Sequence, residues 1–402
     1  MKKKVLAYIE ENQQEILHQL AKLVQIDTQN FRTHGNENKG QDYLEGICRE
    51  LGLSVDRFTP ASVPGLTDSP DYWAGRGADQ RENLVAVFPG QQDENGIMLA
   101  AHMDTETVGA LAEWSVDPFS GLIRDGKLYG RGSGDDKFGI IMAWAVIKAL
   151  QACGFTPDKN ILLGSYCDEE GGGGNGALGL CMKYPCETYV NLDGAEFESV
   201  ASGGGCYAID IWSTKKDLSV ASVFDIYDGV CTLVEELKEL DCRPGTSVRL
   251  SGFSGGEGGE KVGKVKFALY TDMTKEEAAM ELSLIRERVL PKLNEWQLGC
   301  SEFLLRTRFF HYGKTRTDSR EAEIMRDILQ EAEGKQPTGA STGLTDLSIF
   351  LHWGSDNSFN LGMETGSAQG GGPHQVNEHI VCENLIKRIK QLALFVMRTS
   401  KV

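Results

Sequence analysis

A short apolar run, Ile97–Ala101, constrains the fold most strongly, because a histidine and an aspartate follow it directly. An uninterrupted apolar run bounded by a glycine, here Gly96, is typical of a strand that is buried on both faces. His102 and Asp104 would then lie at the carboxyl end of this strand, where open α/β sheets hold their ligands. The run therefore predicts an α/β sheet with a ligand site at this edge.

A glycine-rich loop, GRGSGDDKFG at 130–139, comes next and carries Asp135 and Asp136 ahead of a helix predicted at 140–150. The loop lacks the GK[ST] ending of a phosphate-binding loop, and its two adjacent acids would repel an anion. A histidine near an acid has a plain alternative, in which His102 is only a hydrogen-bonded side chain. The loop and the strand end together favour a bound cation.

Two further apolar runs also end in acids. The predicted strand at 161–166 is followed by Glu169 and Glu170, and the predicted strand at 188–192 ends beside Asp193. A helix separates the first two strands, and this strand–helix alternation is typical of a three-layer α/β domain with a mostly parallel sheet. The acids would then meet at the same edge as His102.

These side chains match the ligands of a bivalent cation such as zinc, which takes imidazole nitrogen and carboxylate oxygen. Adjacent acids need not point the same way, so one of Glu169 and Glu170 can bind a metal while the other serves as a general base. Read singly, this acid pair is a solvated loop and His374 a surface histidine. Read together, the candidate metal ligands are His102, Asp135, one of Glu169 and Glu170, Asp193 and His374, with Asp104 orienting the His102 ring.

The pattern changes after Gly203 to a β-α-β-β-α-β order, which predicts an inserted α+β unit of ferredoxin-like topology. The α/β pattern returns after Arg316. The expected helices are 3–25, 40–51, 223–240, 274–294, 319–333 and 382–397, and the further expected strands are 83–88, 207–213, 247–254, 261–271, 301–310 and 358–361, with a long loop at 60–80.

Charge and composition exclude several classes of partner. The net charge of −17 argues against nucleic acid and anionic membranes. No apolar stretch approaches the ~20 residues that a membrane-spanning helix needs. The N-terminal segment lacks the apolar core of a signal peptide, and the ten scattered cysteines are typical of free thiols in a reducing compartment. We therefore expect a cytoplasmic protein that acts on a small molecule.

Five motifs in a fixed order resemble those of one enzyme family. This family is the dinuclear-zinc metallopeptidases and deacylases, which include acetylornithine deacetylase, succinyl-diaminopimelate desuccinylase, aminoacylase, carboxypeptidase G and peptidase T. The resemblance spans the whole chain. The motifs are HMD at 102–104, WSVDPF at 114–119, DGKLYGRGSGDDK at 125–137, DEEG at 168–171 and HQVNE at 374–378.

The resemblance implies a role for each candidate residue. His102 and Asp193 would hold one zinc, Glu170 and His374 the other, and Asp135 would bridge them, with cobalt or manganese as alternative metals. Asp104 would orient His102, Glu169 would be the general acid and base, and the Asp135–Asp136 peptide bond would be cis. Residues 1–202 and 311–402 would form the catalytic domain, and residues 203–310 a lid through which two copies form a homodimer.

The implied function is hydrolysis of an amide bond in an N-acyl amino acid or a dipeptide, by a metal-activated water with Glu169 as proton carrier. Relatives carry a histidine in the lid, whereas this chain has none between positions 200 and 310. Two alternatives therefore stay open. One is hydrolysis of a non-peptide C–N bond in a carbamoyl or ureido compound, and the other is a binding protein without catalysis on the same fold.

Overall fold

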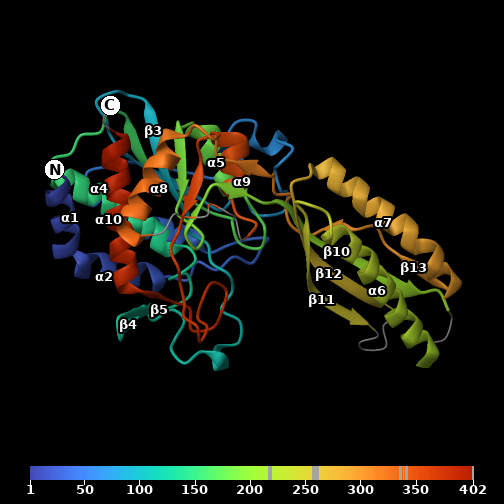
Figure 1. The fold of residues 1–402 in the computed structure, drawn as a ribbon. Helices are drawn as coiled ribbons and strands as arrows, with labels where there is room; N and C mark the ends of the chain where they lie inside the picture. Colours follow the sequence, from blue (N-terminus) through green and yellow to red (C-terminus); the bar gives the residue numbers. More distant parts are fainter. Residues whose placement is uncertain (216–219, 256–261, 335–336, 338, 340–342, 401–402) are drawn as a thin grey trace. The chain divides into compact units, whose positions relative to one another are not determined.

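Figure 1 shows the fold of the chain in a computed structural model, which describes residues 1–215, 220–255, 262–334, 337, 339 and 343–400. The chain divides into two compact units. The first contains Met1–Val200 and most of the chain after Lys314, and the second is formed mainly by Ala201–Gly313. The bounds of the second unit, Ala201–Gly313, are close to those of the insertion predicted at 203–310.

A seven-stranded sheet forms the centre of the first unit, in the order β1-β2-β6-β3-β7-β16-β8. The four strands β6, β3, β7 and β16 are parallel, whereas β1, β2 and β8 are antiparallel to their neighbours at the two edges. The α/β class is therefore confirmed, with the parallel pairs at the centre. The bounds are β1 (Ser54–Phe58), β2 (Asn83–Phe88), β3 (Asn95–His102), β6 (Asn160–Tyr166), β7 (Thr188–Asn191), β8 (Phe197–Glu198) and β16 (Phe359–Leu361).

Side chains of the central strand β3 alternate between two hydrophobic clusters, one on each face of the sheet. Ile97 and Leu99 pack into one cluster, and Met98 and Ala100 pack into the other. This alternation explains the uninterrupted apolar run, since both faces are covered. The first face carries α1 (Lys2–Glu11), α2 (Gln13–Val24), α3 (Glu37–Glu50), α4 (Lys137–Ala152), α8 (Arg320–Glu333) and α10 (Cys382–Thr399), and the other carries α5 (Asn175–Lys183), α9 (Leu347–Ile349) and the π-helical turn Phe350–Gly354.

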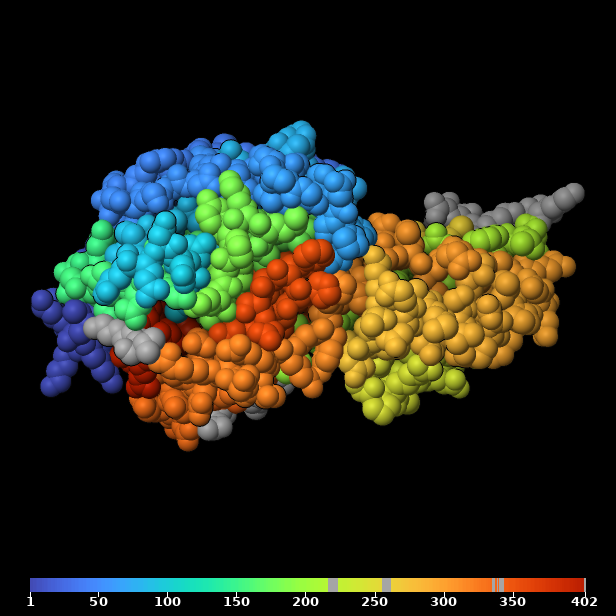
Figure 2. All heavy atoms as spheres, turned by 90° about the horizontal axis from the view of Figure 1, so that it is seen from above, coloured from blue at the N-terminus to red at the C-terminus, as the bar shows by residue number. Residues whose placement is uncertain are grey.

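The two ends of the chain lie side by side in this unit. Helices α1 and α10 pack together, and Lys390 of α10 forms an ion pair with Glu10 of α1. The dark blue and dark red atoms at the left of Figure 2 belong to these helices. A small antiparallel sheet of β4 (Leu122–Arg124), β5 (Lys127–Tyr129) and β17 (His379–Val381) also joins distant segments. It aligns the glycine-rich loop after β5 with the segment that precedes β17.

The second unit contains a five-stranded antiparallel sheet, with two helices packed on it. Four strands follow the order β11-β12-β10-β13, and the short β14 also pairs with β10. Alternate residues of β10, namely Tyr207, Ile209 and Ile211, join the core with α6 and α7. The elements follow the order β10 (Gly203–Ser213), α6 (Val220–Asp241), β11 (Ser247–Gly255), β12 (Val262–Thr271), α7 (Lys275–Glu295), β13 (Leu298–Cys300) and β14 (Leu304–Leu305).

Two sequence-based expectations are wrong in detail. The predicted helix at 3–25 is two helices, which are separated at Asn12. The strand predicted at 301–310 is reduced to the short pairing of β14 with β10 and an isolated bridge between Phe310 and Gly204. The side-chain oxygens of Ser301 and Thr307 accept the N–H groups of Asp210 and Cys206, at 3.0 and 3.1 Å, in place of backbone carbonyls. These side-chain bonds interrupt the ladder along the edge of β10.

The chain leaves and re-enters the first unit at adjacent points, since Thr315 N donates a hydrogen bond to Ser199 O at 2.9 Å. None of the ten cysteines, all of which the structure describes, forms a disulfide, and Cys231 and Cys242 are exposed. Within the described residues, every helix is too short or too polar to cross a membrane.

Candidate metal centre

The carboxyl ends of three neighbouring parallel strands converge, as the sequence predicts. His102 is the last residue of β3 and is aligned with Tyr166 at the end of β6. Glu169 and Glu170 follow β6, and Asp193 follows β7 on the other side of β3. Because parallel strands end at the same edge, side chains from separate segments reach one place.

The first group of potential metal ligands consists of His102, Asp135 and Asp193. Each offers one ligand atom, and these atoms all lie within 4.8 Å of one another. His102 Nε2 lies 2.9 Å from Asp135 Oδ1. The Asp135–Asp136 peptide bond is cis, which confirms the expectation from the sequence resemblance.

The second group consists of Asp135, Glu170 and His374, again within 4.8 Å. His374 Nε2 lies 3.0 Å from Asp135 Oδ2 and 3.0 Å from Glu170 Oε2. The two oxygens of Asp135 thus face two different imidazoles. The structure brings together all five residues that the sequence singled out, in two groups that share Asp135.

The chemistry of these donors fits a pair of bivalent cations. Burial and the nearby Asp135 carboxylate raise the pKa of Glu170 and of Asp193 to about 7 each. Burial acts in the same direction on Asp135, but the hydrogen bonds with His102 and His374 outweigh it and lower the pKa of that carboxyl. Crowded, buried carboxylates repel one another, and cations between them relieve this repulsion. Imidazole and carboxylate donors are those that zinc prefers.

Glu169 and Glu170 diverge, although they are adjacent. Glu170 Oε1 accepts a hydrogen bond from Glu106 N at 2.8 Å, and its other oxygen faces His374. Within the described residues, Glu169 belongs to neither ligand group. Burial raises the pKa of Glu169 well above its usual range, and the negative charges of Asp346 and Glu170 act in the same direction. This carboxyl group is therefore one that can hold a proton near neutral pH.

Asp104 contacts His102 differently from the expectation. His102 Nδ1 lies 2.9 Å from the backbone oxygen of Asp104, whereas the nearer carboxylate oxygen is 3.8 Å away. The carbonyl therefore fixes the ring, which leaves Nε2 directed at Asp135. The Asp104 carboxylate instead accepts the N–H groups of Glu169 and Glu170, at 3.1 and 2.9 Å.

Two residues of the HQVNE motif have a positional role that sequence reasoning missed. Glu378 is fully buried, accepts the N–H of Gly134 at 2.8 Å and forms an ion pair with Arg131. Asn377 Oδ1 accepts the N–H of Ser115 at 2.7 Å. The segment that carries His374 is therefore tied to the loop that carries Asp135. Asn377 and Glu378 follow His374 by three and four residues in the same motif, and this spacing could have identified them from the sequence.

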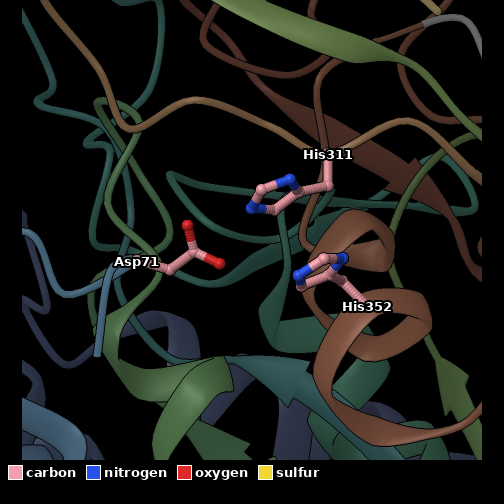
Figure 3. A group of neighbouring side chains, drawn as sticks. All are labelled: Asp71, His311 and His352. Atoms are coloured by element: carbon pink, nitrogen blue, oxygen red, sulfur yellow. The ribbon is translucent and has the colours of Figure 1, made fainter. Parts of the chain in front are cut away.

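Other acidic and imidazole side chains lie outside these groups. Figure 3 shows Asp71 and His352 of the first unit, together with His311 of the second. Asp71 accepts a hydrogen bond from Trp353 Nε1 at 2.6 Å, and the His352 ring packs edge-on against Trp353. These contacts account for Asp71 and His352 as parts of the first unit's own packing.

Parts of the chain are similar in sequence to known enzymes. A segment of 215 residues is 26% identical to N-formyl-4-amino-5-aminomethyl-2-methylpyrimidine deformylase of Halalkalibacterium halodurans, covering 53% of this chain and 45% of the relative. A segment of 142 residues is 35% identical to succinyl-diaminopimelate desuccinylase of Rhodopseudomonas palustris, covering 35% of this chain and 32% of the relative. The matched segments thus span less than half of these relatives.

The fold is also that of solved structures. The dipeptidase Dug1p of Saccharomyces cerevisiae superimposes with a TM-score of 0.75 over 100% of this chain and 99% of that one, at 16% identity. At this identity the likeness shows the fold. The model of the family described as "Peptidase family M20/M25/M40" matches residues 98–398, which include all five residues of the two ligand groups. The chain therefore belongs to peptidase family M20/M25/M40.

Proposed function

We propose that the protein is a metal-dependent hydrolase that cleaves the amide bond of a small N-acyl amino acid or a dipeptide. The observation that carries this proposal is the pair of ligand groups that share Asp135, with the Glu169 carboxylate beside them. Family membership supports it, and so do the relatives, which are named as a deformylase and a desuccinylase.

Two metals would be held by these side chains. His102 and Asp193 would bind one, Glu170 and His374 the other, and the two oxygens of Asp135 would serve both. Zinc suits this donor set best, with cobalt or manganese as alternatives. When bound, such ions supply Lewis acidity, which polarises a carbonyl oxygen and acidifies water.

Glu169 would carry the proton. Its carboxylate takes a proton from the water whose oxygen forms the new C–O bond, and it passes this proton to the amide nitrogen as the C–N bond breaks. The raised pKa, caused mainly by burial, favours a carboxyl group that can hold the proton between these two steps. The products are a carboxylic acid and an amine.

A substrate panel tests this proposal against its two alternatives. Purified protein is supplied with zinc, cobalt or manganese and assayed against N-acetyl and N-succinyl amino acids, dipeptides and N-carbamoyl amino acids, with Glu169→Gln as the matched control. We expect turnover of an amide by the wild type and a large loss in the control. Turnover of carbamoyl compounds alone would favour the ureido hydrolase. Ligand binding with no turnover under any metal would favour the binding protein.

We further propose that the second unit serves as a lid and as the contact of a homodimer. Strand β11 lies at the edge of its sheet, and within the described residues it pairs with β12 alone. Phe253 of this strand lines one apolar hollow together with Phe224 and Tyr227 of α6, and Phe224 and Phe253 are each 63% exposed. An edge strand that has a neighbour on one side only and carries exposed aromatic side chains is typical of a protein–protein contact.

A further inference from the structure

Two arginines from the long loop before β2 are buried in the first unit. Arg76 is 4% exposed and Arg81 is 1% exposed. Arginine is almost never this buried unless its charge is paired, so both must have partners in the interior. The partners identify what this loop contributes to the site.

Both arginines contact the acid that precedes Glu169 and Glu170. Arg76 Nε and Nη2 lie 2.8 and 2.7 Å from Asp168 Oδ1, and Arg81 Nη1 lies 2.8 Å from the same oxygen. Arg81 is also paired with Glu37 of α3. Arg76 makes a different second contact, in which Nη2 donates to Glu170 O at 2.7 Å.

Hydrogen bonds hold all four polar backbone atoms of Glu169 and Glu170. Both N–H groups donate to the Asp104 carboxylate, Glu169 O accepts from Gly173 N at 3.1 Å, and Glu170 O accepts from Arg76 and from Asn30 Nδ2. Two adjacent side chains can diverge reliably only if the backbone between them cannot turn. Asp168 itself has a φ of 65°, a conformation that its surroundings must maintain.

We propose that Arg76 is a positioning residue, which fixes the backbone of Glu169 and Glu170 through Asp168 and the Glu170 carbonyl. One carboxylate then faces His374 while the other stays free for the proton. The Arg76 guanidinium bonds both to Asp168 and to the Glu170 carbonyl. The proposal rests on the proposed function, because it concerns how the same two carboxylates are placed.

Substitution with rescue tests the proposal. Arg76→Ala removes the guanidinium and leaves space that millimolar guanidinium chloride can refill. Metal stoichiometry is measured during competition with a chelator, and kcat and KM are measured separately. We expect about a 10- to 100-fold loss of kcat with little change in KM, together with weaker retention of one of the two metals. Added guanidinium should restore both readouts in part.

Arg57→Ala is the matched control. Arg57 also lies in the first unit and is paired with three carboxylates, namely Asp42, Glu45 and Glu82, none of which is a candidate metal ligand. It should keep normal kcat and both metals, and guanidinium should have no effect on it. Arg76→Lys is the second variant, since it retains the charge but loses the fork that bonds to Asp168 and Glu170 O together, and it should show the same loss of kcat.

The outcomes separate this proposal from the one it rests on. Wild-type kcat and two retained metals in folded Arg76→Ala or Arg76→Lys would overturn the positioning role. A lower melting temperature in both variants, with no kinetic or metal-binding change, would also overturn it and assign Arg76 to stability alone. An inactive wild type that binds no metal would instead refute the proposed function.

Discussion

His374 Nε2 lies 3.0 Å from Glu170 Oε2, so a segment near the end of the chain and the end of β6 contribute to one point. The sequence neighbours of each residue do not show that these two side chains meet. The sheet provides Glu170, and the loop tied down by Asn377 and Glu378 provides His374. Because both segments would hold the same metal, we expect the loss of either side chain to release it.

Removal of either histidine should therefore release metal. His102→Ala and His374→Ala should each bind about one metal fewer than the wild type, and both should unfold at lower temperature, because a metal that binds only the folded state stabilises it. Elemental analysis and thermal melts with and without a chelator measure both effects. His18→Ala, at an exposed position of α2, is the control. Full metal content in His102→Ala would contradict the assignment.

Substitutions of the two adjacent glutamates should have different effects on metal binding and on kcat. Glu169→Gln should retain both metals and near-normal KM while kcat falls by ~10²–10⁴, the usual contribution of general acid and base catalysis. Glu170→Gln should lose one metal, and excess metal should partly restore its activity. Steady-state kinetics and metal content decide between them. If Glu169→Gln loses metal and Glu170→Gln does not, the two roles are exchanged.

Assembly should depend on the apolar hollow of the second unit. Phe253→Asp places a charge beside Phe224 and Tyr227 and should convert a dimer into a monomer of normal melting temperature. Light scattering after size-exclusion chromatography measures the mass. Leu111→Asp, at a position of the first unit that is 64% exposed, is the matched control and should stay dimeric. A wild type that is monomeric at every concentration would refute the dimer.

One carboxylate should make stability depend on acid pH. Burial acts to raise the pKa of Glu333, but the hydrogen bond from Gln391 and the charges of Arg388 and Lys387 outweigh it, so the pKa is lowered. A lowered folded-state pKa gives a stability contribution that is present above about pH 4.5 and lost as the pH falls through the folded pKa.

Glu333→Gln should therefore reduce the free energy of unfolding by about 1 kcal/mol or less at pH 7, since the group is partly exposed, and by almost nothing near pH 3. Urea unfolding at the two pH values measures the difference. Asp327→Asn, at an exposed position of the same helix, is the control. An equal loss at both pH values would show that packing, not charge, is responsible.

The sequence singles out residues that the structure brings together, because most of these candidate ligands follow a local signal. His102 follows an apolar run, Glu170 lies in an acid pair after another run, and Asp135 lies in a glycine-rich loop. Arg76 could not be found in this way, since it lies in a loop without periodicity and its role depends on the distant Asp168. The atom of Asp104 that contacts His102 is also set by local geometry rather than by spacing.

The strand expected at 301–310 shows where prediction from the sequence fails. Its apolar composition suits a strand, but a ladder needs backbone carbonyls in register, and the hydroxyls of Ser301 and Thr307 take their place. Nothing in the composition distinguishes a hydroxyl that faces solvent from one that bonds to the neighbouring strand. Pairing of this kind becomes visible only in three dimensions.

The hydrogen bond from Thr315 N to Ser199 O joins the two points at which the chain leaves and re-enters the first unit. For the folding of the first unit, the insertion is therefore a loop whose ends are held together. The entropy cost of closing a flexible loop grows by only about 0.6 kcal/mol for each doubling of its length. A change in the length of the insertion therefore alters the entropy cost of folding the first unit only slightly. Evolution can lengthen, shorten or rebuild the insertion while the fold that carries His102, Asp135 and His374 stays intact.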